Sequence, residues 1–365
     1  MAGRLRRGRP PPAGVAPQTL GPTTLFDARW DHHAGATTFT RLLLRGLTEE
    51  RPPGRWLLWG PASMVGAGWP GATHVPTSVD PVAWFGQRSA LRLPSADRVF
   101  HPHQTRPLHR IPAASCILDL IQLQHPFPPL RLAKTLRLRA SVRAARRLFT
   151  ITSSVRDELI ASFGADPASV TVLRLPVDRD VGARGAARRM PARYLLAVGR
   201  FERHKNLPRL VDAFARTRFA ATGGALHLAG GTAAELAALG VESVPAGVRV
   251  LGSLGAAALE ETMAGATALV QASLVEGYGL PVAEALMGEV PVVSSPVPAA
   301  TEFGPAGLPV FDPRSVASMA EVIDETVDLI DAGRYWERVD RPAWLAAQPT
   351  VRDLARQVVA GLPGQ

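Results

Sequence analysis

The chain has few of the residues on which several protein classes depend. A single cysteine among 365 residues excludes an internal disulfide, and this agrees with a reducing cytoplasm as the expected compartment. No stretch approaches the roughly 18–20 uninterrupted apolar residues of a membrane-spanning helix. The 46% of hydrophobic residues are therefore expected to form the cores of a globular protein. The length suffices for two domains.

Lysine is scarce as well. Lys134 and Lys205 are the only two lysines, so arginine supplies almost all of the positive charge behind the formal net charge of +10. Together with the abundant Ala, Gly and Pro, this composition indicates a GC-rich coding sequence more than a nucleic-acid-binding surface. No aromatic-rich basic groove motif is present, and we expect no nucleic-acid partner. Lys205 is informative because its compact ammonium differs physically from the guanidinium that the chain otherwise uses.

The stretch at residues 276–284 (EGYGLPVAE) lies between two apolar runs, 267–273 and 290–295, which predict buried parallel strands. Its two glycines allow a sharp turn and a close approach to a ligand, and its proline then favours the start of a helix. A strand–loop–helix unit places its loop at the carboxyl edge of the sheet, where open α/β sheets bind ligands. Free N–H groups at the helix start favour phosphate there.

Strand-like and helix-like segments alternate along the whole chain. Apolar runs predict strands at 56–59, 73–77, 98–101, 115–120, 148–152, 170–173, 194–198, 225–231 and 248–252. Helices are predicted at 38–47, 130–147, 155–163, 206–219, 315–332 and 351–362. Ser153 or Ser154 is the expected N-cap of the third of these helices. This alternation predicts an α/β protein with doubly wound parallel sheets.

The composition also suggests domain boundaries. We expect a disordered tail at 1–22, rich in Arg, Pro and Gly. An N-terminal domain at 23–180 and a C-terminal domain at 194–340 are joined by a polar linker at 181–193. The remaining residues, 341–365, are expected to form a helix that packs back on the N-terminal domain.

Two motifs give the chain a family resemblance. Glu276 and Glu284 have seven residues between them and are followed by an extended matching segment, 287–313. Residues 198–206 (VGRFERHKN) form the second motif, also after a predicted strand. In order and spacing they resemble the retaining, family 4-like glycosyltransferases (glycosyl transferases group 1). The resemblance implies the GT-B architecture, in which two Rossmann-like domains face each other across a cleft.

The resemblance also implies roles for individual residues. Glu276 would contact hydroxyls of the donor sugar and Glu284 the nucleotide ribose, while Arg200 and Lys205 suit phosphate oxygens. Tyr278 would either contact the ligand or only pack against its loop. The implied donor-binding residues are Gly35, Gly199, Arg200, Lys205, Glu276, Gly277, Tyr278, Gly279, Leu280 and Glu284. The implied catalytic residues are Glu276, Arg200, Lys205 and Asp119.

One position departs from the family pattern. Leu118 stands where members of the family often carry a histidine that contacts the donor sugar, although Asp119 matches the acid that follows it. A leucine cannot hydrogen-bond a hydroxyl, so the departure means a different donor sugar, a shifted role for another residue, or lost activity. His101 and His103 are candidate substitutes on the acceptor side of the cleft. The alternative is that each is a surface-loop histidine without function.

The resemblance leads to an expected reaction. A hexose, mannose in preference to glucose or N-acetylglucosamine, would pass with retention from a GDP- or UDP-linked donor to a glycan or lipid-linked acceptor. Cationic side chains and loop amides would stabilise the departing diphosphate, so we expect neither a metal nor a cofactor. Asp178 and Asp180 form an Asp-x-Asp sequence, but it falls at a domain boundary. The alternative is a catalytically silent GT-B protein that binds nucleotide sugar or scaffolds a glycan-assembly complex.

A basic segment at 130–147 suggests a further partner. Its arginines and Lys134 alternate with leucines, as in helices that lie on anionic membranes. A solvated outer face of the domain explains the same pattern. The first interpretation predicts a peripheral enzyme at the inner face of the membrane.

Overall fold

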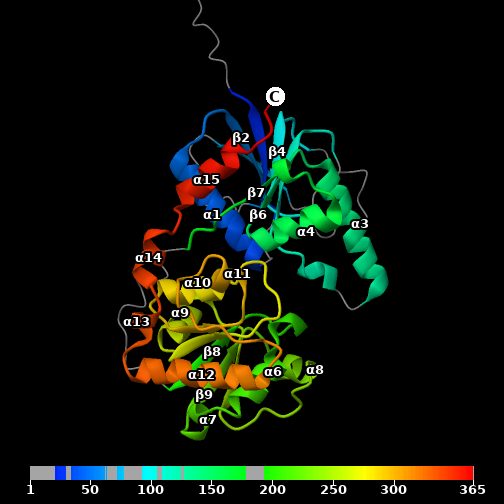
Figure 1. Ribbon diagram of the computed structural model, residues 1–365. Coiled ribbons are helices and arrows are strands. Elements are labelled where there is room, and N and C mark those ends of the chain that lie inside the picture. Colours follow the sequence, from blue (N-terminus) through cyan, green and yellow to red (C-terminus); the bar gives the residue numbers. More distant parts are fainter. Residues whose placement is uncertain are drawn as a thin grey trace, which may run out of the picture.

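The computed structural model describes residues 21–29, 34–61, 63, 72–77, 93–104, 109–124, 127–177 and 193–364. These residues form two α/β domains, one above the other in Figure 1, each built on its own parallel sheet. The predicted fold class is confirmed: this is the GT-B arrangement of two Rossmann-like domains.

The N-terminal sheet has seven described strands in the order β3-β2-β1-β4-β5-β6-β7, and every described pairing is parallel. The strands are β1 (Thr23–Asp27), β2 (Arg55–Gly60), β3 (Ala72–Pro76), β4 (Arg98–His101), β5 (Ala113–Ile117), β6 (Arg147–Thr150) and β7 (Val170–Val172). All five residues of β5 are buried, as a strand covered on both faces requires. Cys116 is among them, and burial raises the pKa of its thiol.

The helices of this domain are α1 (Ala34–Glu50), α3 (Pro128–Ala144) and α4 (Ser153–Phe163), with short 3-10 turns η2 (Ile121–Gln124) and η3 (Pro167–Ser169). The expected cap of α4 is wrong by one residue. Thr152 is the N-cap, and its hydroxyl accepts a hydrogen bond from the Val155 amide. The predicted helix 130–147 also ends early, because Arg147 already pairs in β6.

The C-terminal sheet has the order β10-β9-β8-β11-β12 and is again parallel. Its strands are β8 (Tyr194–Val198), β9 (Ala225–Ala229), β10 (Val248–Gly252), β11 (Ala268–Gln271) and β12 (Val292–Ser294). The turn η4 (Arg203–Lys205) precedes helices α6 (Leu207–Phe214), α7 (Arg218–Ala221), α8 (Ala233–Ala238), α9 (Ala256–Ala264), α10 (Leu280–Met287), α11 (Pro298–Thr301) and α12 (Val316–Asp331).

One predicted helix of this domain is in fact two. The sequence predicts a continuous helix over 206–219, but α6 ends at Phe214 and α7 begins at Arg218. Thr217 explains the break, because its hydroxyl donates to the Phe214 carbonyl and accepts from the Ala220 amide. A side chain that satisfies one helix end and caps the next makes two helices more favourable than one.

The end of the chain returns to the first domain. Helices α13 (Tyr335–Arg338), α14 (Arg341–Ala346) and α15 (Val351–Ala360) follow α12, and Figure 1 shows them running beside both domains until α15 lies against α1. Residues 1–20 of the expected tail, and residues 178–192 with most of the expected linker and both aspartates of the Asp-x-Asp sequence, lie outside the described residues. Within the described part of the chain, no helix combines the length and apolar character needed to cross a membrane.

Candidate active site between the two domains

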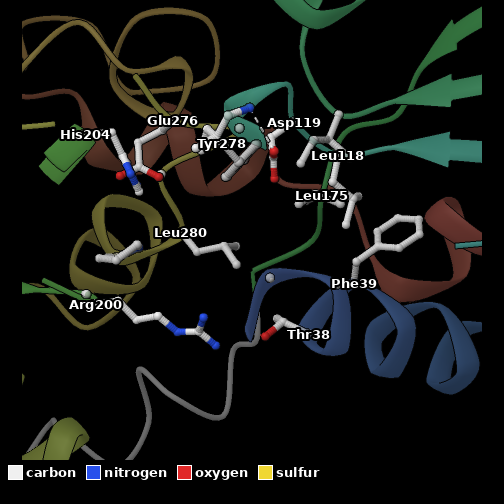
Figure 2. Close-up of a pocket in the computed structure, with 18 of the residues that line it drawn as sticks. Thr38, Phe39, Leu118, Asp119, Leu175, Arg200, His204, Glu276, Tyr278 and Leu280 are labelled. Carbon is white, nitrogen blue, oxygen red and sulfur yellow. Dashed lines mark hydrogen bonds between the residues drawn. The ribbon is translucent and has the colours of Figure 1, made fainter. Parts of the chain in front are cut away.

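A cavity of about 440 Å³ lies between the two domains. The N-terminal domain contributes Gly35, Thr38, Phe39, His103, Leu118 and Asp119 to its lining, among others. The C-terminal domain contributes Gly199, Arg200, Glu202, His204, Lys205, the loop and helix start at 276–281, and Glu284. Figure 2 shows several of these side chains converging on one space from the two domains. Segments far apart in the sequence therefore meet where the two predicted motifs lie.

Glu276 is the most strongly held side chain of the cavity. Its Oε1 atom accepts hydrogen bonds from Lys205 Nζ at 2.6 Å, Ser273 Oγ at 2.7 Å and Gln271 Nε2 at 2.9 Å. The Lys205 contact is an ion pair whose two side chains are 15% and 11% exposed. Among the described residues, no donor bonds Oε2, so this oxygen is left for a ligand. Three donors on one oxygen fix the orientation of the carboxylate before any ligand binds.

Sequence reasoning missed two of these three donors. Gln271 is the last residue of β11, and Ser273 follows two positions later, both in a run that the apolar pattern identifies only as a buried strand. Gln271 Nε2 also bonds Ser273 Oγ at 2.7 Å. The sequence did contain a signal for these donors: polar residues at the end of an apolar strand, directly before a candidate site loop. Such residues are expected at the site because the carboxyl ends of parallel strands face the ligand.

The loop after Glu276 touches the opposite domain. A Cβ atom on Gly277 would lie 2.8 Å from the Leu118 carbonyl oxygen and 2.9 Å from the Asp119 Cβ. Gly277 is therefore needed for the two domains to approach this closely. Gly279 has φ +97° and is the N-cap of α10, whose first residue is Leu280. The first residues of α10 line the cavity, where the positive end of the helix dipole favours an anion.

The second motif brings two cations to the same space. Gly199 has φ +137°, and a Cβ there would lie 2.8 Å from Lys205 Cε, so glycine makes room for Lys205 to lie across the strand end. Arg200 is exposed, and its guanidinium points across the cavity towards Thr38 of α1 (Figure 2). Among the described residues, no carboxylate pairs with Arg200. It is available for a ligand anion.

Asp119 faces Glu276 from the other domain. Its carboxylate accepts a hydrogen bond from the Ile121 amide at 3.1 Å. Burial raises the pKa of Asp119, and the nearby charges of Glu276 and Glu202 act in the same direction, while the Ile121 hydrogen bond opposes them. Two carboxylates from different domains thus converge at this end of the cavity.

His204 is a cavity residue that the family resemblance does not single out. Its side chain is 12% exposed, and its Nδ1 lies 3.3 Å from the Glu202 carboxylate. Burial lowers the pKa of His204 and Lys205 lowers it further, against the opposing effect of Glu276. The signal was present in the second motif, since the residue before Lys205 is also carried to the strand end.

Glu284 and Tyr278 lie at the C-terminal wall. Glu284 is half-buried in α10, and burial, with a smaller effect of Glu260, raises its pKa. Tyr278 is 5% exposed and stacks on Phe303 with ring centroids 5.4 Å apart, and burial raises its pKa to about 12. Tyr278 therefore packs against its neighbours and also lines the cavity.

The two candidate acceptor-side histidines lie in different places, and only one of them lines the cavity. His103 lines the cavity together with Gly35 and Leu118. His101 does not, and the view of it as a loop residue is wrong: it ends β4 and is fully buried. Its Nδ1 lies 3.0 Å from Asp27 Oδ2 and its Nε2 lies 3.0 Å from His109 Nε2. These contacts hold His101 inside the domain.

The described residues contain no group of three or more His, Cys, Asp or Glu side chains arranged to hold a metal ion. The polar groups that line the cavity are instead two cations, several carboxylates, two imidazoles and a helix start. This set can bind an elongated ligand that carries phosphate at one end and hydroxyl groups at the other.

Comparisons with known proteins agree with this geometry. Residues 192–328 match the model of the family described as glycosyl transferases group 1, whereas no match is found among curated proteins. Solved structures similar to the chain include a sucrose-phosphate synthase from Thermosynechococcus elongatus, with TM-score 0.67 and 15% identity over 93% of this chain and 97% of that one.

Two further solved structures are similar over the same share of the chain. Anabaena HepE in complex with UDP-glucose has TM-score 0.66 and 15% identity over 93% of this chain and 98% of that one. A UDP-forming trehalose-phosphate synthase from Burkholderia vietnamiensis has TM-score 0.62 and 12% identity over 93% and 98%. At these identities the likeness shows the fold alone. The chain thus has the GT-B architecture, and its residues 192–328 match the glycosyl transferases group 1 model.

Proposed function

We propose that the protein is a retaining glycosyltransferase that moves a hexose from a nucleoside-diphosphate sugar to a glycan or lipid-linked acceptor without a metal ion. The observation that carries this proposal is the Lys205–Glu276 ion pair in the interdomain cavity, with Lys205 Nζ and Glu276 Oε1 2.6 Å apart. Glu276 lies in the loop just before α10. A cation and a carboxylate held together in this way suit the junction between a diphosphate and a sugar.

The charges of the cavity explain how such a transfer would proceed. When the bond between sugar and phosphate breaks, negative charge grows on the departing diphosphate. Arg200, Lys205 and the positive end of the α10 dipole supply fixed positive charge for it, which is the usual way a transition state is stabilised electrostatically. No described side chain is placed as a nucleophile in this proposal. The departing phosphate takes the proton of the acceptor hydroxyl on the same face, which retains the configuration.

The carboxylates bind and orient the sugar. Glu276 Oε2 accepts a hydrogen bond from one sugar hydroxyl, while Oε1 remains held by its three protein donors. Asp119 approaches from the other domain and Glu284 binds the ribose. Positioning of this kind supplies part of the rate enhancement, because the reacting groups lose little further freedom on the way to the transition state.

The sugar and nucleobase remain open within this proposal. The resemblance favours mannose on a GDP- or UDP-linked donor, and the similar HepE structure is a complex with UDP-glucose. Both donors thus belong in the first test.

That test measures binding and turnover of a panel of UDP-, GDP-, ADP- and TDP-sugars with EDTA present. It compares the wild type with Glu276→Ala and with the exposed control Glu242→Ala. We expect slow hydrolysis or transfer of one donor by the wild type and the control, with a loss of at least about 100-fold in Glu276→Ala, as for removal of one transition-state contact. If no donor binds, the proposed function is wrong.

The leucine at the cavity wall favours one alternative. Leu118 is 5% exposed and lines the cavity, where it cannot hydrogen-bond a sugar. A protein that binds nucleotide sugar without transferring it is consistent with this apolar wall. Binding of a donor without hydrolysis, and without transfer to any glycan or lipid-linked acceptor offered, would favour this alternative over the enzyme.

We also propose that an anionic lipid surface is a partner of α3. Three large apolar side chains of α3 and that of Phe127, just before it, are exposed. The exposed fractions are 59% for Phe127, 41% for Leu130, 59% for Leu132 and 54% for Leu136. The sequence from 121 to 156 contains no Asp or Glu, whereas it has many arginines. Exposed apolar side chains within a purely basic segment suit the boundary between anionic headgroups and acyl chains.

Co-sedimentation with vesicles checks this proposal. The wild type should sediment with phosphatidylglycerol vesicles at low salt and remain in solution with phosphatidylcholine vesicles, because the attraction is partly electrostatic. The double variant Leu132→Ser/Leu136→Ser should bind at least about tenfold more weakly, since it loses buried apolar area. Val244→Ser, which alters an exposed valine elsewhere, is the control. Equal sedimentation of the double variant and the wild type would contradict the proposal.

A further inference from the structure

The imidazole of His204 occupies a defined place in the cavity. It belongs to the turn η4, and the Leu274 amide donates to the His204 carbonyl at 2.8 Å, which ties this turn to the segment before Glu276. Asn206, which follows Lys205, has φ +59°, and its side-chain amide donates to the Ala272 and Pro313 carbonyls. The backbone around His204 is thus fixed on both sides. Figure 2 shows the ring beside Glu276 and facing the cavity.

The N-terminal domain contributes a partly apolar wall beside the Asp119 carboxylate. Leu118, Ile151 and Leu175 line the cavity from the N-terminal domain, and none of them can hydrogen-bond. The polar groups near His204 are carboxylates, which only accept hydrogen bonds when ionised, and Lys205, which only donates. A sugar at this place presents hydroxyls, each of which both donates and accepts. Because Nδ1 of His204 faces the Glu202 carboxylate 3.3 Å away, Nε2 of the neutral imidazole is left to accept a hydrogen bond from such a hydroxyl.

The protonation state of His204 suits this task. Burial lowers its pKa from the ordinary 6.5, and the positive charge of Lys205 acts in the same direction, while Glu276 opposes both. The ring is therefore neutral near pH 7, with one nitrogen as donor and the other as acceptor. A neutral ring also adds no second cation beside Lys205.

We propose that His204 hydrogen-bonds a hydroxyl of the transferred sugar, beside Glu276 in the cavity that Leu118 lines from the other domain. The proposal rests on the proposed function, since it requires a nucleotide sugar in this cavity. It makes His204 a residue that distinguishes one donor sugar from another. His204 has no role in binding the nucleoside diphosphate in this proposal. Arg200, Lys205 and the start of α10 bind it instead.

The test compares binding of a nucleotide sugar with binding of its free nucleoside diphosphate. Calorimetry would use UDP-glucose against UDP and GDP-mannose against GDP, with the wild type, His204→Ala and His204→Asn. We expect His204→Ala to bind the nucleotide sugar about tenfold more weakly, as for the loss of one hydrogen bond with a partner left unsatisfied. Binding of the free diphosphate should stay within about twofold. His204→Asn, which keeps a donor and an acceptor, should recover part of the loss.

A matched control removes a histidine of the same domain that does not line the cavity. His227 stacks on Tyr194 with ring centroids 4.2 Å apart, and His227→Ala should bind both ligands like the wild type. If His204→Ala weakens the diphosphate as much as the nucleotide sugar, its role is only to support Lys205, and the proposal is overturned. Unchanged binding of both ligands overturns it too. A wild type that binds none of these four ligands and no ADP- or TDP-sugar of the donor panel refutes the proposed function itself.

Discussion

At the scale of one residue, the position of Asp119 suits the proposed function but lowers the stability of the folded protein near pH 7. Its carboxylate faces Glu276 across the cavity, and burial and the two neighbouring carboxylates Glu276 and Glu202 raise its pKa above the ordinary 3.8. When the pKa of an acid is higher in the folded than in the unfolded protein, the folded state is favoured while the acid is protonated. The folded state therefore loses stability as the pH rises from below 3.8 through the raised pKa, and the loss is complete above that pKa.

We predict that Asp119→Asn stabilises the protein at pH 7 and impairs its function. Asparagine cannot ionise, yet its carbonyl oxygen can still accept the Ile121 hydrogen bond. The free energy of unfolding of the variant should exceed that of the wild type at pH 7, and the difference should vanish near pH 3. Urea unfolding between these pH values measures it, with the exposed Glu242→Gln as control. A difference that does not depend on pH would contradict the prediction.

The residues of the site were predictable to different degrees. Arg200, Lys205, Glu276 and Glu284 belong to motifs, and the structure places all four on one cavity. Gln271 was not predicted, because its role depends on which strand end meets which loop in space. His101 shows the opposite error: it was a candidate for the acceptor side or a surface loop, whereas it is buried and its contact with Asp27 joins residues 74 positions apart. Pairings of this kind leave no periodic pattern in a sequence.

At the scale of elements, the packing of α15 on α1 depends on one small residue. A Cβ atom on Gly46 would overlap the Val351 carbonyl oxygen at the start of α15 and would lie 3.1 Å from the Ala355 Cβ. The ion pairs Arg352–Glu49 and Arg356–Glu50 lie beside this contact, at 3.3 and 2.9 Å. Because they are partly exposed, they contribute little stability. The close approach of the two helices is the main constraint.

We therefore predict that Gly46→Ala destabilises the protein by about 1–3 kcal/mol, the usual cost of overpacking a well-packed contact. The matched control is Gly35→Ala in the same helix, because a Cβ there meets nothing within 4 Å. Thermal unfolding of both variants measures the difference. Equal melting temperatures for Gly46→Ala and Gly35→Ala would show that α15 moves to accept the methyl group without cost.

Elements were more predictable than their ends. Each apolar run from which a strand was predicted, in both halves of the chain, contains one. Most of these strands are buried on both faces and are therefore apolar, whereas the edge strands β3 and β10 are only partly covered. Helix ends depended instead on single hydroxyls, as at Thr152 and Thr217, each of which caps a helix through its own side chain. Serine and threonine are abundant nearby, so the sequence does not show which of them adopts the extended backbone that an N-cap requires.

At the scale of the whole molecule, the two domains meet through a few specific contacts. Gly277 approaches the backbone of Leu118 and Asp119. On another side, Glu302 of the C-terminal domain accepts hydrogen bonds from Ser153, the first residue of α4, through the Ser153 amide at 2.9 and 3.0 Å and its hydroxyl at 2.6 Å. A carboxylate at a helix start is favourable because it faces the positive end of the helix dipole. The sequence could not predict this contact, which joins positions 149 apart.

We predict that Glu302→Gln shifts the protein towards a more open arrangement of its domains. The glutamine lacks the charge that strengthens all three bonds, and hydrogen bonds to charged groups contribute about 1.5–3 kcal/mol each when buried. At this partly exposed site we expect a smaller total, on the order of 1 kcal/mol, or roughly a fivefold larger open population. Small-angle scattering should show a larger radius of gyration for Glu302→Gln than for the wild type without ligand. The control is Glu325→Gln, which alters an exposed glutamate of α12. A radius of gyration equal to that of the wild type and the control would mean that the contact at Gly277, rather than the one at Ser153, holds the domains together.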